Sequence, residues 1–136
     1  MCQAAHTFQM KKPLIVMAAA ETATGLGLLA LPSLCARLIL GAELETAVAI
    51  TLARVAGVAL LTLGVACWRA RDDTDSRATT GLVSAMSLYN AGVCAVLLYA
   101  AWVAKLSAVG LWPVAVAHAG LAAWCLASLA PRRLTG

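Results

Sequence analysis

Four polar side chains interrupt the apolar runs of this sequence, one in each of four runs: Glu21, Arg54, Asn90 and His118. A carboxylate and an imidazole exchange protons, a guanidinium holds an anion, and an amide both donates and accepts hydrogen bonds. Such groups inside a membrane are candidates for a ligand-binding or proton site. The alternative is a structural role, in which an ion pair and two hydrogen-bonding groups fix the packing of the helices.

The depths of these four residues in their runs are similar. Counted at 1.5 Å per residue from the predicted cytoplasmic ends, Glu21 is about 12 Å deep and Arg54 about 21 Å. Asn90 and His118 fall between them. An isolated charge at the bilayer centre costs about 2.5–3.5 kcal/mol. We therefore expect Glu21 and Arg54 to pair inside one bundle, with Asn90 and His118 nearby.

The elements that must position these residues follow from composition. Of the 136 residues, 62% are hydrophobic and 12% are charged, against about 45–50% and 25% in a soluble domain. Each of four apolar runs is long enough to cross a bilayer as a helix. No ten-residue alternation indicates a membrane β-barrel. The sequence predicts one all-α domain over 1–136, an integral membrane four-helix bundle with helices at 13–31, 46–68, 80–103 and 108–130.

Three short connections join the predicted helices. The first, 32–45, is apolar with a few charges, which favours a short helix lying in the membrane interface and ending at Gly41. The second, 69–79, is strongly hydrophilic and is predicted to be a solvated cytoplasmic loop. The third, near 105–110, is tight.

Charge asymmetry predicts the orientation. With both termini in the cytoplasm, seven of the ten Lys and Arg residues lie inside and two lie outside, as the positive-inside rule requires. The remaining one, Arg54, lies within a span. Because the basic residues punctuate apolar runs instead of forming one soluble face, the net charge of +4 does not indicate nucleic-acid binding. Glu21 interrupts the first run, which favours a retained helix over a cleaved signal peptide. We expect a multi-pass protein of the bacterial inner membrane.

The five cysteines do not form a redox or metal motif. None is part of a Cys-x-x-Cys pair, and an odd number cannot pair completely. A membrane disulfide oxidoreductase needs a resolving thiol close to the attacking one. We interpret Cys67, Cys94 and Cys125 as small packing residues and predict no metal site.

Two stretches carry a family resemblance. Residues 31–41 read L-P-S-L-C-A-R-L-I-L-G, and residues 49–68 read A-x-x-L-A-R-x-x-G-x-A-L-L-x-L-G-x-A-x-W. This half of the chain resembles the small four-helix bacterial inner-membrane proteins of the DoxX-like group. The resemblance implies a four-helix bundle, and some members of that group accompany quinone-linked redox enzymes. The elements that would be shared are Pro32, Gly41, Arg54, Gly57, Gly64 and Trp68.

Three functions are compatible with these observations. The first is a non-enzymatic membrane protein that binds a small apolar or amphipathic ligand or docks on a larger membrane complex. Its small-residue faces, Gly57 with Gly64 and Ala115 with Ala122, would also suit a homo-oligomer or a partner helix. The second is proton-coupled transport of a small solute through Glu21 and the imidazole of the fourth run. The third is a quinone-linked redox subunit, although the sequence shows no pair of residues that would ligate a redox cofactor.

Overall fold

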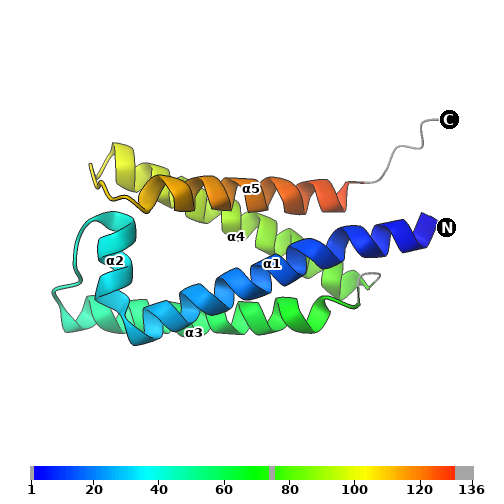
Figure 1. Ribbon diagram of the computed structural model, residues 1–136, viewed down its shortest axis with the longest axis horizontal. Helices are drawn as coiled ribbons and strands as arrows, with labels where there is room; N and C mark the ends of the chain where they lie inside the picture. Colours follow the sequence, from blue (N-terminus) through cyan, green and yellow to red (C-terminus); the bar gives the residue numbers. More distant parts are fainter. Residues whose placement is uncertain (1, 74–75, 131–136) are drawn as a thin grey trace.

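The computed structural model describes residues 2–73 and 76–130, with side chains from Met10 onward. The described chain is all-α and contains five helices (Figure 1). Four of them contain segments long and apolar enough to span a membrane: Met10–Ala30, Ala47–Ala70, Arg77–Trp102 and Leu111–Leu129. The five helices are α1 (Cys2–Ala30), α2 (Pro32–Leu40), α3 (Ala47–Ala70), α4 (Arg77–Trp102) and α5 (Leu111–Leu129).

Local signals in the sequence set several helix ends. The hydroxyl of Thr46 accepts a hydrogen bond from the Ala49 N–H at 3.1 Å, which caps the start of α3. Ser76 caps α4 in the same way through the N–H of Thr79, also at 3.1 Å. The short helix α2 starts with proline and stops at Gly41, whose φ of 79° is left-handed. The predicted short helix ending at Gly41 is therefore present.

The first helix is longer than the sequence predicts. It begins at Cys2 instead of residue 13 and passes through Pro13, which is buried. A proline lacks the N–H that would bond four residues back, yet membrane helices tolerate this when neighbouring helices pack around it. The predicted start at residue 13 follows the beginning of the apolar run, and the structure shows Pro13 inside the helix.

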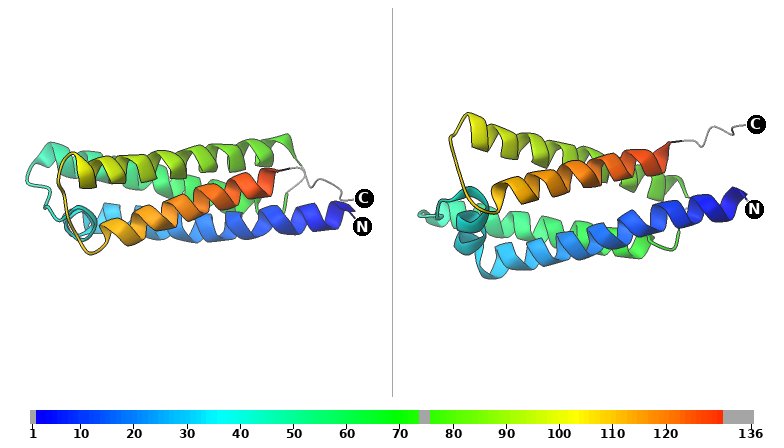
Figure 2. Two further views of the ribbon diagram at one scale, coloured as in Figure 1. Left: turned by 90° about the horizontal axis from the view of Figure 1, so that it is seen from above. Right: turned by 45° about the horizontal axis from the view of Figure 1, so that its top comes forward.

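The helices form two antiparallel pairs, α1 with α3 and α4 with α5 (Figures 1 and 2). The first pair approaches closely at glycines. A Cβ atom added to Gly25 would lie 2.8 Å from the Gly57 carbonyl oxygen, and one added to Gly57 would lie 2.9 Å from that of Gly25. Further along, Gly64 faces the Ala18 backbone. Small residues therefore allow the α1 and α3 backbones to touch.

These contacts correct one expectation. Gly57 and Gly64 are buried against α1, and Ala115 and Ala122 are buried within the chain as well. The Ser87 hydroxyl donates to the Ala122 carbonyl oxygen at 3.3 Å, which ties α5 to α4. The predicted small-residue faces are thus used to pack the chain on itself, so they are not free for a partner helix.

The core lies toward the end of the bundle where α1 starts and α5 ends. There Met10, Leu14, Met17, Met86 and the thiols of α3 and α5 pack together from all four long helices. Because these side chains fill the space between the two pairs, this half of the bundle is closed. The two thiols, Cys67 and Cys125, are free and fully buried, which agrees with a packing role.

At the opposite end, α2 lies across the bundle instead of along it (Figure 1). The Gly110 N–H donates to the Leu38 carbonyl oxygen at 3.0 Å, so the loop between α4 and α5 is fastened to α2. Gly41 packs directly against the backbone oxygen of Ser107, leaving no space for a side chain. A helix transverse to the four long ones would lie in the membrane plane if those helices span the bilayer.

Candidate functional site

Three of the four predicted residues converge between the two helix pairs. Glu21 of α1 and His118 of α5 line one cavity of about 180 Å³, together with Tyr89 of α4. Asn90 lies directly behind His118, with its amide oxygen 2.8 Å from the imidazole Nδ1. The remaining wall of the cavity is mostly apolar: Ala20, Thr24, Val114, Ala117 and Leu121.

The hydrogen bonds around Asn90 fix the chemistry of the imidazole. The Asn90 amide nitrogen donates to the Met86 carbonyl oxygen at 2.8 Å, so the amide oxygen is the atom that faces His118. An oxygen can only accept, which requires the proton on Nδ1 of His118. In the neutral ring Nε2 then carries a lone pair and acts as an acceptor.

Tyr89 links the imidazole to the carboxylate. Its ring meets the His118 ring edge-on, with centroids 6.1 Å apart. Its hydroxyl donates to Oε2 of Glu21 at 3.3 Å. Glu21 is only 3% exposed, and among the described residues its second oxygen, Oε1, has no hydrogen-bond partner. A buried polar atom without a partner costs free energy, so Oε1 is an acceptor available to a molecule in the cavity.

Arg54 does not belong to this site, and its predicted pairing with Glu21 is wrong. The Arg54 side chain is exposed on α3, and among the described residues it forms no ion pair. The close contact of Gly25 with Gly57 puts Arg54 level with residue 28 of α1. Seven residues, or about 10 Å along the axis, then separate the levels of Arg54 and Glu21.

The helical period explains why Arg54 faces outward. At 100° per residue, the four buried residues of α3 lie on average about 100° round the helix from Arg54. Side chains also lean toward the helix N-terminus, and the start of α3 is about 10 Å from Arg54. Its long side chain can therefore extend along the apolar surface toward the start of α3, so that no internal carboxylate is needed.

Tyr89 is the site residue that the sequence interpretation missed. A signal for it exists, because membrane aromatics concentrate at the two interfaces whereas Tyr89 lies mid-helix. Trp102 and Trp112 show the usual placement, with ring centroids 6.4 Å apart near the end of the bundle that carries α2. A tyrosine away from both helix ends needs a hydrogen-bond partner, and Glu21 provides it.

No protein-family model, curated protein or solved structure matches this chain. Within the described residues, no group of three His, Cys, Asp or Glu side chains is placed to hold a metal ion. The site is therefore assigned from its own geometry: two acceptors and a phenol at the edge of an otherwise apolar cavity.

Proposed function

We propose that this protein is a multi-pass protein of the bacterial inner membrane that binds a small amphipathic molecule in the cavity between its helix pairs. The observation that carries the proposal is the unpartnered Oε1 of buried Glu21 at the cavity wall. Binding sites of this kind combine an apolar wall with a few placed polar groups. The protein would act by binding, without catalysing a reaction.

The polar groups of the cavity define the ligand class. Glu21 Oε1 and His118 Nε2 both accept hydrogen bonds, so the ligand should carry a donor, an amine or a hydroxyl. An apolar cavity of about 150 Å³ holds a benzene-sized molecule. At about 180 Å³ this cavity therefore suits one ring or a short branched chain.

Titration with three matched probes tests the proposal. Benzylamine and benzyl alcohol carry a donor, whereas toluene has the same ring and none. In detergent micelles, the first two should raise the melting temperature saturably and more than toluene does. Glu21→Gln should reduce benzylamine affinity about tenfold, because hydrogen bonds to charged groups contribute about 1.5–3 kcal/mol.

The matched control is Glu43→Gln. Glu43 is an exposed carboxylate that pairs with Arg37 at 3.0 Å on the surface, far from the cavity lining. This variant should bind benzylamine like the wild type. Equal stabilisation by toluene and benzylamine, or an unchanged affinity in Glu21→Gln, would refute the proposal.

Proton-coupled transport is the second candidate, favoured by one observation. A carboxylate and an imidazole, the two groups best suited to carry protons, line the same cavity. In proteoliposomes, a benzylamine gradient should then drive proton movement that Glu21→Gln abolishes. If benzylamine binds but drives no proton flux, the protein is a binder and this candidate is rejected.

The resemblance to the DoxX-like group suggests a quinone as another ligand. Quinone carbonyls are acceptors, and they would face the acceptors of Glu21 and His118. A hydroquinone, which carries two hydroxyl donors, matches these groups better. The cavity therefore favours the reduced form of such a molecule over the oxidised one.

A further inference from the structure

A second hollow lies on the outer side of the α1/α3 pair, away from the cavity described above. This groove has a volume of about 570 Å³ and its lining is almost wholly apolar. Its floor is Ala18 and Gly64, where the two backbones meet. Its walls are the exposed side chains Ile15, Ala19, Ala23, Leu26, Val65 and Trp68.

The dimensions of the groove match a single lipid chain. Along α1 it runs from Ile15 to Leu26, which is about 16 Å at 1.5 Å per residue. Half of a bilayer's hydrocarbon thickness is about 15 Å, the depth that one acyl chain covers.

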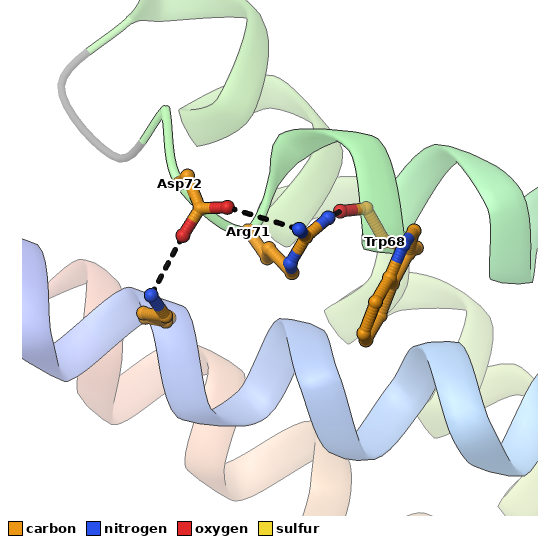
Figure 3. A network of polar contacts seen from close by, with 4 residues as sticks. Trp68, Arg71 and Asp72 are labelled. Carbon is orange, nitrogen blue, oxygen red and sulfur yellow. Dashed lines mark hydrogen bonds and ion pairs between the residues drawn. The ribbon is translucent and has the colours of Figure 1, made fainter.

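One end of the groove carries an aromatic ring and a cation. Trp68 lines the groove, and the Arg71 guanidinium lies over its ring at 4.0 Å (Figure 3). Arg71 also donates to the Trp68 carbonyl oxygen at 2.6 Å and pairs with Asp72 at 3.2 Å. Asp72 accepts from Lys11 of α1 at 2.6 Å, which closes this end of the helix pair.

The charge at this end is positive. Lys11, Lys12, Arg69 and Arg71 contribute four positive charges, against two negative charges from Asp72 and Asp73. The net charge is therefore +2 at the mouth of an apolar furrow. Tryptophan and basic residues are the usual anchors at the level of lipid headgroups.

We propose that the α1/α3 groove is a binding site for an anionic phospholipid. One acyl chain lies along Ala19 and Ala23, and the phosphate lies at Arg71 beside Trp68. This site is separate from the proposed ligand cavity, because it uses the opposite side of α1. Each basic residue near an anionic headgroup strengthens binding about fivefold.

Fluorescence quenching of Trp68 tests the proposal. In a protein whose other three tryptophans are replaced by Phe, Trp68 is the only indole. Two sets of phosphatidylcholine nanodiscs would carry the same low fraction of a lipid with brominated acyl chains. This brominated lipid is phosphatidylglycerol in one set and phosphatidylcholine in the other. We expect the brominated phosphatidylglycerol to quench Trp68 with at least fivefold higher apparent affinity, and Arg71→Gln should lower this preference about fivefold.

A groove-filling variant and its matched control separate this site from bulk lipid. Ala19→Phe fills the groove and should abolish the preference, and Ala23→Leu serves if that variant does not fold. Ala56→Phe makes the same change on the exposed surface of α3 outside the groove, and it should keep the preference.

Three results would overturn the proposal. The first is equal quenching by the two brominated lipids in the wild-type background. The second is a preference that persists in Ala19→Phe or that is unchanged in Arg71→Gln. The third is quenching that appears only when the protein is diluted among the nanodiscs, because a second copy of the chain would then occupy the groove.

Discussion

Two double-mutant cycles give the sharpest test of the site geometry. The first removes the Asn90–His118 hydrogen bond through Asn90→Ala, His118→Phe and the double variant. The second uses Glu21→Gln and Arg54→Leu in the same way. A cycle isolates the interaction free energy of two residues. It therefore distinguishes residues in contact from residues that only lie at a similar depth in their helices.

The structure predicts different magnitudes for the two cycles. The Asn90–His118 bond is short, at 2.8 Å, and Asn90 is fully buried. Polar couplings within membranes average about 0.6 kcal/mol and reach about 1.7 kcal/mol. We expect about 1–1.5 kcal/mol for this pair. Glu21 and Arg54 share no partner and differ in level by about 10 Å, so their effects should add within about 0.3–0.5 kcal/mol.

All variants are unfolded in mixed detergent micelles under one condition. Circular dichroism monitors the unfolding and gives its free energy. The Asn90 cycle serves as the positive control for the sensitivity of the method. Additive effects of Asn90→Ala and His118→Phe would mean that this hydrogen bond is absent. A Glu21–Arg54 coupling of about 1 kcal/mol or more would refute the outward placement of Arg54.

Three further predictions concern the ends of the bundle. Gly41→Ala should lower the free energy of unfolding by about 1–2 kcal/mol or more, because a left-handed φ is costly for alanine and there is no space for its methyl group. Gly92→Ala is the control: it lies on open helix surface and should not lower stability. Thermal unfolding compares the two variants. The hydrogen bond from Lys11 holds the pKa of Asp72 below its usual value. Asp72→Asn should therefore melt at a lower temperature than the wild type at pH 7, and the difference should disappear as the pH falls below about 4. A difference in melting temperature that stays constant with pH would contradict this. In variants that keep a single cysteine, an impermeant thiol reagent applied to intact cells should label Cys35 but not a cysteine introduced by Asp73→Cys, and labelling at position 73 would reverse the proposed orientation.

The sequence alone was sufficient for the elements and for part of the site. Long apolar runs have to be helices in a bilayer, because only internal hydrogen bonds satisfy the backbone there. Proline at the start of α2 and glycine at its end mark a short helix, because proline suits the first turn and glycine tolerates the left-handed backbone that ends a helix. Depth along a helix follows from counting residues, which is why Glu21, Asn90 and His118 are found near one level.

Only the tertiary structure decided which way each side chain points. The faces of α1 and α3 that meet are set by the contact of Gly25 with Gly57, and that choice turns Arg54 outward. The same packing brings Tyr89 of α4 to Glu21, although nothing in the spacing of the two residues links them. Sequence periodicity defines faces within one helix, but the rotation of each helix against its neighbours depends on which small residues allow the closest approach.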